Sequence, residues 1–219
     1  MRLMTSCLRP ALAALFLLGL CLGLAREAVA DQPGEIINVW PLAGGSPDSG
    51  EAFRILYRST GLKGEPISVS GAIYTPPGDP PAGGRDVIAY GHPTSGVVEK
   101  CAPSLMPDNA GLIWGLKSML AQGYIVVATD YPGLGTPGIH PYLIGISEGR
   151  AVLDSVRAAR ALPRSGASDR FVLWGHSQDG HAVLYAGEMA KAYAPKLKLF
   201  GIAAAAPATY LVELFDADK

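Results

Sequence analysis

The sequence predicts an α/β fold, with a mainly parallel β-sheet flanked by helices. From residue 87 onward, short apolar runs rich in β-branched and aromatic residues alternate with stretches of helical periodicity. Such alternation gives βαβ units and therefore parallel strands. Two strand-like stretches joined by a turn come before it, which indicates an antiparallel start. The apolar run at 171–174 leads straight into a turn of small residues and a helix.

The first thirty residues have the pattern of a signal peptide. Arg2 and Arg9 form a basic region, residues 11–25 form an apolar run, and residues 28–30 give a small-x-small cleavage pattern. The run is shorter than the roughly 20 apolar residues of a membrane span. We therefore expect a cleaved leader, no stable membrane anchor, and a secreted or periplasmic protein.

The charge of the chain excludes some classes of partner. The 219 residues include 18 basic and 19 acidic side chains, a formal net charge of −1. This balance gives no sign of a nucleic-acid partner or of an anionic membrane surface. Nothing in the sequence indicates an oligomeric state.

Two strands are expected after an N-terminal arm. Residues 31–50 are rich in Pro, Gly, Ser and Asp, and we expect them to be irregular. Residues 53–59 and 67–74 have strand composition, and a turn separates them. The loop "TPPGDPPAGGRD" then excludes regular structure up to residue 86. Residues 31–219 are long enough for one domain with a sizeable core.

Strands and helices alternate in the rest of the chain. Apolar residues at helical spacing predict a helix over 112–120, and Ser147 is expected to cap a helix that reaches Leu162. A third helix is expected directly after Ser177, with Val183 and Met189 on its apolar face. The buried strands between these helices are expected at 87–90, 124–129, 171–174 and 199–208.

The stretch "WGHSQDG" at 174–180 is the first candidate for a catalytic motif. A serine between a strand and a helix, flanked by small residues, is the arrangement of a nucleophile elbow. Ser177 is therefore the candidate nucleophile. The N–H of Gln178 would donate to the developing oxyanion at the helix N-terminus. The alternative is an ordinary serine that caps an ordinary helix.

A second oxyanion donor is expected in the loop after an earlier strand. The stretch "AYGHPTSGV" at 89–97 contains a proline, two small hydroxyl residues and a glycine, which suit a close backbone approach to a substrate carbonyl. Thr94 and Ser95 are both candidates, and the sequence does not decide between them. The alternative is a plain surface loop.

Five stretches taken together carry a family resemblance. They are "AYGHPTSGV", "CAPS", "DYPGLGTPGIHPYL", "EGRAVLDSVRAAR" and "WGHSQDGHA", in this order along the chain. Over about residues 50–210 the chain resembles the secretory lipase family of α/β-hydrolases. The resemblance implies a secreted carboxylester hydrolase that acts on small-molecule esters or acylglycerols, without a metal or an organic cofactor.

The chain departs from the family pattern at Asp179. The family has G-H-S-Q-G-G, so a carboxylate replaces a glycine two residues after Ser177. We expect backbone strain there of about 1–3 kcal/mol. A negative charge beside an oxyanion site would also oppose catalysis.

A second departure concerns the acid and the base. In this fold the triad runs Ser, Asp or Glu, then His along the chain. After Ser177 the sequence has one histidine, His181, which lies in the same helix, and we expect His92, His140 and His176 to be structural or to line loops. Asp216 and Asp218 belong to an expected fraying tail. These observations predict that residues 51–219 are the N-terminal portion of an α/β-hydrolase domain and that the C-terminal part with the acid and the base is missing.

The single cysteine that follows the leader, Cys101, leaves two interpretations open. It is either a free buried thiol or a thiol whose partner is absent. The resemblance implies a disulfide with the later part of the chain, and favours the second.

We expect a serine ester hydrolase, of the lipase or esterase type. Two alternatives remain: a non-catalytic or inactive hydrolase fragment that lacks the acid and the base, and a peptidase or amidase of the same fold.

Overall fold

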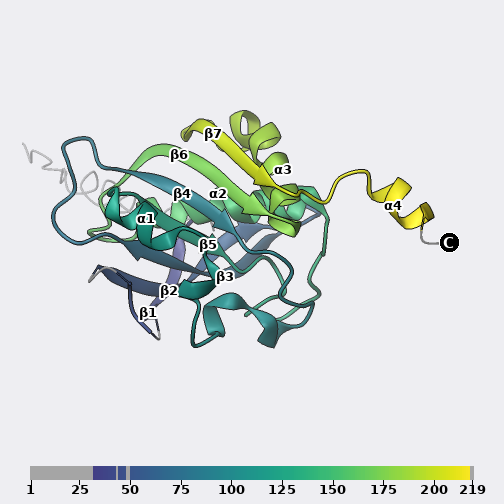
Figure 1. Cartoon of the computed structure of the whole chain (residues 1–219), viewed down its shortest axis with the longest axis horizontal. Helices are drawn as coiled ribbons and strands as arrows, with labels where there is room; N and C mark the ends of the chain where they lie inside the picture. The colour runs from purple at the N-terminus through teal and green to yellow at the C-terminus, as the bar shows by residue number, and fades with distance from the viewer. Residues whose placement is uncertain (1–31, 43, 48–49, 218–219) are drawn as a thin grey trace, which may run out of the picture. The chain divides into compact units, whose positions relative to one another are not determined.

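A mixed β-sheet organises the part of the chain that the structure describes (Figure 1). The computed structural model describes residues 32–42, 44–47 and 50–217, and the expected leader lies outside them. Within these residues seven strands form the sheet in the order β1-β2-β3-β5-β4-β6-β7. Their bounds are β1 Ile36–Pro41, β2 Glu51–Thr60, β3 Pro66–Thr75, β4 Arg85–Gly91, β5 Ile125–Thr129, β6 Ala167–His176 and β7 Lys198–Ala205.

The pairing of the strands changes once across the sheet, from antiparallel to parallel. Strands β1, β2 and β3 pair antiparallel, and β3 pairs antiparallel with β5. Strands β5, β4, β6 and β7 are parallel to one another. The predicted antiparallel start and parallel remainder are therefore both present. In the parallel part, the carboxyl ends of the strands and the loops that follow them share one edge of the sheet.

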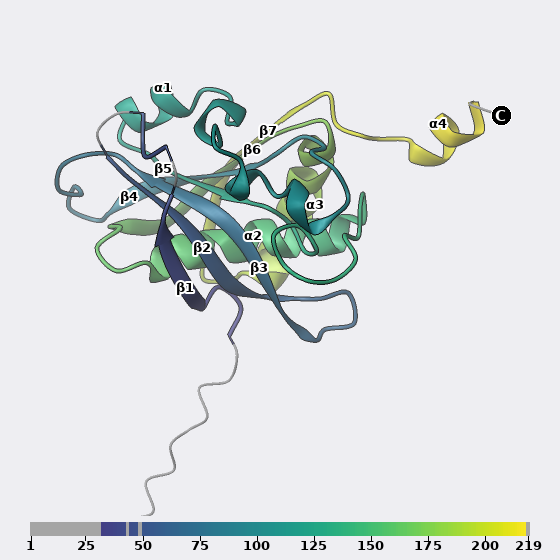
Figure 2. The same cartoon turned by 90° about the horizontal axis from the view of Figure 1, so that it is seen from below.

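The α-helices are α1 (Leu116–Ala121), α2 (Gly145–Ala161), α3 (Gln178–Tyr193) and α4 (Leu211–Ala217), and short 3₁₀ turns cover Glu99–Cys101, Pro103–Leu105 and Ala110–Leu112. Helices α2 and α3 bury one face of the sheet with Val87 and Ala89. Helix α1 buries the other face with Ile88 and Tyr90. Figure 2 shows α1 and α2 separated by strands. Because both faces are covered, all five residues of β5 are buried.

The N-terminal arm is not irregular throughout, contrary to the prediction for residues 31–50. Ile36–Pro41 forms strand β1, in which Val39 lies opposite Ile55 and Pro41 lies opposite Phe53 of β2. The run "IINVW" has strand propensity, but the prolines and glycines around it dominate the composition of that stretch. The free edge of β2 supplies the hydrogen-bonding partner that the local sequence does not reveal.

Several expected boundaries were also wrong. The helix expected over 112–120 is interrupted, because Gly115 has φ 83° and α1 begins only after it. Helix α2 begins at Gly145, so Ser147 lies buried inside it and is not its cap. Strand β7 ends at Ala205, before the expected residue 208.

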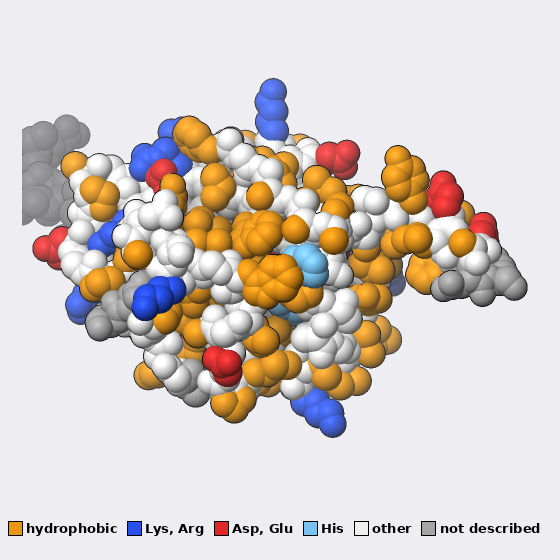
Figure 3. Space-filling view, in the orientation of Figure 1, with side chains coloured by type: hydrophobic (Ala, Val, Ile, Leu, Met, Phe, Trp, Pro, Cys, Tyr) orange, Lys and Arg blue, Asp and Glu red, His pale blue; other side chains and the backbone are white. Residues whose placement is uncertain are grey.

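The expected fraying tail is helical over α4, which lies away from the sheet (Figure 1). Asp216 belongs to this helix, whereas Asp218 lies outside the described residues. The helix has no buried residue. Hydrophobic side chains are visible on this segment in Figure 3. No helix among the described residues is long and apolar enough to cross a membrane.

Candidate active site

Ser177 lies at the junction between β6 and α3. Its backbone has φ 59° and ψ −118°, a conformation that few non-glycine residues adopt. Its N–H donates to the carbonyl of Ala205 at 3.0 Å, and its own carbonyl accepts from the N–H of His181 at 3.2 Å. The strand–turn–helix context that the sequence predicts is therefore present, and Ser177 is half-buried in it.

Small residues allow this turn to pack closely. A Cβ added at Gly180 would lie 2.8 Å from Cα of Pro207 and 3.0 Å from the carbonyl oxygen of Ala205. A Cβ added at Gly175 would overlap the side chain of Asp179. The first turn of α3 therefore depends on glycine on both sides of Ser177.

Asp179 is not strained, and this corrects the expectation from the sequence. Its backbone is helical, and its φ is not positive. The carboxyl is fully buried, accepting a hydrogen bond from the N–H of Gly91 at 2.7 Å and another from the hydroxyl of Tyr131 at 2.9 Å. The side chain thus links the start of α3 to the ends of β4 and β5.

The charge of Asp179 also differs from the expectation. Burial raises the pKa of this carboxyl well above its ordinary range, although the hydrogen bonds from Tyr131 and Gly91 oppose the rise. Burial therefore favours the neutral form. The expected repulsion of an oxyanion by a fixed negative charge is correspondingly weakened.

The loop that follows β4 lies at the same edge of the sheet as Ser177. Strand β4 is the parallel neighbour of β6, with Tyr90 opposite Trp174, and Gly91 donates to Asp179 at the start of α3. In this loop Thr94 is exposed, and its hydroxyl forms a 2.9 Å hydrogen bond with that of Tyr142. The hydroxyl of Ser95 is buried without a partner among the described residues.

A buried polar network that the sequence did not predict holds the side chain of Gln178. The amide nitrogen of Gln178 donates to Oε1 of Glu148 at 2.7 Å and to Nε2 of His140 at 3.1 Å. Nδ1 of His140 lies 2.9 Å from the carbonyl of Pro132, which places the proton on Nδ1 and leaves Nε2 as the acceptor. Glu148 also accepts from the N–H of Leu143 at 3.0 Å.

Burial sets the protonation of this network. It raises the pKa of Glu148 to about 7, against the opposing hydrogen bonds from Gln178 and Leu143. Burial lowers the pKa of His140, which favours the neutral ring. The residue that follows Ser177 is therefore fixed by a neutral imidazole and by a carboxyl that is about half protonated at pH 7. The stretches "EGRAV" and "GIHPY" contained the only sequence signal for Glu148 and His140.

The other three histidines contact groups other than the hydroxyl of Ser177. His92 is buried, with Nδ1 2.7 Å from the carbonyl of Pro93. Nδ1 of His181 lies 3.0 Å from the carbonyl of Ala208. The ring of His176 packs 4.5 Å from that of Trp114. Among the described residues, no hydrogen bond joins a histidine side chain to Ser177.

Cys101 has a free thiol in the described part of the chain and is half-buried. It packs against Gly96, where an added Cβ would overlap the sulfur. The disulfide that the resemblance implies stays a prediction.

Comparisons with known proteins show that the chain is similar to lipases and esterases. A family profile described as "Secretory lipase" matches residues 113–218. Lipase A of Moesziomyces aphidis is 26% identical over 174 residues, which cover 72% of this chain and 35% of that protein. "Probable inactive lipase MT1628" of Mycobacterium tuberculosis (strain CDC 1551 / Oshkosh) is 28% identical over 172 residues, 74% of this chain and 38% of that protein.

A solved structure has the same arrangement of elements. The rice cell wall degrading esterase LipA from Xanthomonas oryzae superposes with a TM-score of 0.67 and 26% identity, over 78% of this chain and 50% of that one. The chain thus spans half or less of the length of these three proteins.

Proposed function

The chain belongs to the secretory lipase family and has the α/β-hydrolase fold of its solved relatives, and from this premise we propose that it hydrolyses carboxylic esters with Ser177 as the nucleophile. The observation that carries this proposal is the backbone of Ser177. A non-glycine residue with φ 59° between a strand and a helix costs about 1–3 kcal/mol and is typical of functional sites. In a nucleophile elbow, this turn presents the serine hydroxyl at the top of the sheet.

The start of α3 supports the stabilisation of an oxyanion. The first N–H groups of a helix have no acceptor within the helix, and the helix dipole favours negative charge there. In the proposed reaction, Oγ of Ser177 attacks the ester carbonyl carbon, and the N–H of Gln178 donates to the resulting oxyanion. Thr94 or Ser95 supplies the second donor from the loop after β4. Collapse of the adduct breaks the ester C–O bond, and the departing alkoxide takes up the proton lost by Oγ and leaves as the alcohol. Water then hydrolyses the acyl ester on Ser177, which releases the carboxylic acid and restores the hydroxyl.

The buried network explains how Gln178 would be held for this role. Its amide is fixed from α2 by Glu148 and from the loop after β5 by His140. A residue whose side chain is immobilised on both sides keeps its N–H in one orientation, and such preorganised donors contribute strongly to catalysis.

The substrate class follows from the family. We propose small-molecule esters, including acylglycerols. We also propose export, because residues 1–30 have the pattern of a leader.

A non-catalytic role is the second candidate, and two observations favour it. The side chains of the four histidines of the described residues contact groups other than the hydroxyl of Ser177. One relative is itself described as a probable inactive lipase. Without a base, only the oxyanion hole and binding remain, which in serine hydrolases leave about 10³–10⁴-fold acceleration over water.

Two measurements on residues 31–219 test the proposal. A p-nitrophenyl phosphonate should label Ser177, as located by peptide mass spectrometry, and p-nitrophenyl butyrate should be hydrolysed slowly. Ser177→Ala should abolish both, whereas Ser118→Ala, at an exposed serine of α1, should change neither.

The outcomes separate the candidate functions. Equal rates and equal labelling for the chain and Ser177→Ala would refute the proposed nucleophile and favour the non-catalytic role. Faster cleavage of the matching p-nitroanilide would indicate a peptidase or amidase.

A further inference from the structure

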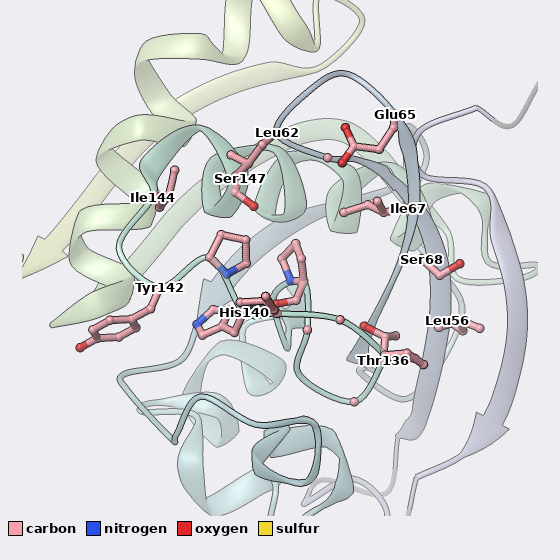
Figure 4. A pocket seen from close by; sticks show the side chains of 18 of the residues that line it. Leu56, Leu62, Glu65, Ile67, Ser68, Thr136, His140, Tyr142, Ile144 and Ser147 are labelled. Atoms are coloured by element: carbon pink, nitrogen blue, oxygen red, sulfur yellow. Dashed lines mark hydrogen bonds between the residues drawn. The ribbon is translucent and has the colours of Figure 1, made fainter.

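A cavity lies beside the buried network of Gln178, Glu148 and His140, and Ser177 does not line it. This cavity has a volume of about 1090 Å³ and lies between the loop 132–142 and the strands β2 and β3 (Figure 4). Its volume is at the upper end of the range for small-molecule sites, about 300–1,000 Å³. His140 contributes to its wall, so the cavity and the network are neighbours.

The wall of the cavity is mainly apolar. Figure 4 shows Leu56 and Ile67 on the strand side, and Tyr142 and Ile144 on the opposite side. Large apolar side chains remain exposed around it: Ile139 is 91% exposed, Leu62 44% and Ile144 43%. Exposed apolar side chains grouped around one hollow are typical of a binding site.

Arg54 supplies a fixed positive charge to this apolar wall. Its Nε donates to Oγ of Ser104 at 3.0 Å, and its guanidinium lies 5.2 Å from the centre of the Trp40 ring. A weaker contact of 3.4 Å joins Nη2 to the carbonyl of Gly135. A guanidinium has five N–H donors, so several stay available. No carboxylate in the described part of the chain forms an ion pair with Arg54.

The charged side chains that line the cavity carry a net positive charge. Lys63 lies on the β2–β3 turn, and Glu65, on the same turn, accepts a 2.8 Å hydrogen bond from the N–H of Lys63. The lining therefore includes two cations, Arg54 and Lys63, and one carboxylate, Glu65. An anionic group on an apolar ligand would complement this wall.

We propose that the cavity binds a long-chain monocarboxylate, with the carboxylate on Arg54 and the hydrocarbon chain along the apolar wall. Ser104 and Trp40 already hold the guanidinium, so the side chain of Arg54 loses little conformational freedom when the ligand binds. The proposal does not depend on hydrolysis at Ser177, because that residue does not line the cavity.

Displacement of a fluorescent fatty acid, 11-(dansylamino)undecanoic acid, from the full chain tests this proposal. Palmitate should displace the probe at least about tenfold better than hexadecanol, because a charge-assisted hydrogen bond contributes more than a neutral one. Arg54→Gln should weaken probe binding about tenfold, and Arg54→Lys should weaken it less. Ser118→Ala, at an exposed serine of α1 away from the cavity, should leave it unchanged.

A matched pair of substitutions at exposed positions tests the cavity without changing Arg54, so a folding defect of the Arg54 variants cannot affect the result. Ile139→Asp places a carboxylate at the rim and should weaken binding, whereas Phe200→Asp, at a 69% exposed side chain on β7, should not. Equal affinity for palmitate and hexadecanol, unchanged binding in Arg54→Gln, or loss of binding in Phe200→Asp or Ser118→Ala would each overturn the proposal. If the protein does not bind the probe but sediments with phosphatidylcholine vesicles, and Ile139→Asp abolishes the sedimentation, this surface contacts a membrane and the proposed carboxylate site is refuted.

Discussion

Replacing Asp179 with glycine restores the residue of the family pattern, and we expect it to destabilise this protein. The carboxyl lies between Gly91 and Gly175 and accepts from Gly91 and Tyr131. Asp179→Gly removes both acceptors and leaves a buried N–H and a buried hydroxyl without partners. It relieves no backbone strain, because the φ of Asp179 is not positive.

The size of the effect follows from these contacts. Each buried donor left without a partner costs about 1–3 kcal/mol, and glycine within a helix costs about 0.5–1 kcal/mol more. Release of the buried carboxyl offsets part of this cost at neutral pH, since burial raises its pKa. We therefore expect the free energy of unfolding to fall by about 2–3 kcal/mol at pH 7, which corresponds to a Tm lower by about 5–10 °C in a domain of this size.

Urea unfolding of residues 31–219, followed by circular dichroism, measures this change. Asp179→Asn is the control, because its amide oxygen still accepts from Gly91 while its charge is removed. The pKa of Asp179 is higher in the folded protein than in the unfolded chain, so the aspartate is most stabilising at low pH and loses this contribution as the pH rises. The asparagine variant should therefore gain on the wild type between pH 4 and 8. A glycine variant as stable as the wild type at pH 7 would refute the assigned contacts.

Two further predictions concern neighbouring groups. Folding raises the pKa of Glu148 from 4.5 to about 7. The free energy of unfolding of the wild type should therefore fall by about 3 kcal/mol relative to that of Glu148→Gln as the pH rises from 4.5 to 7, and the difference should stay constant at higher pH. A difference in urea unfolding that does not change from pH 4.5 to 7 would contradict the burial of the acid. Gly91→Ala should destabilise by about 1–3 kcal/mol because its Cβ would overlap the carboxyl of Asp179 and the hydroxyl of Tyr131, and part of this cost should disappear in the Asp179→Gly background. Additive effects in that double-mutant cycle would show that Gly91 and Asp179 do not interact.

Local patterns in the sequence were enough to predict the central strands and the turn at Ser177. Apolar runs, helical spacing and small residues each lie within a window of about ten residues, and the backbone conformation of such a window follows largely from its own side chains. This is why β4, β5, β6 and α3 lie where the sequence predicts them. Strand β1 was missed because its partner is the outer edge of β2, a tertiary contact that the composition of residues 31–50 does not reveal.

The state of Asp179 and the network around Gln178 were decided by tertiary structure alone. By sequence, Asp179 is a carboxylate in place of a glycine, for which strain and repulsion are the expected consequences. Its partners Gly91 and Tyr131 lie 88 and 48 residues away along the chain, and Glu148 lies 30 residues from Gln178. Whether a buried polar group stabilises or destabilises depends on the donors that reach it and on its distance from water. Both are fixed only when the ends of β4 and β5 meet the start of α3 at one edge of the sheet.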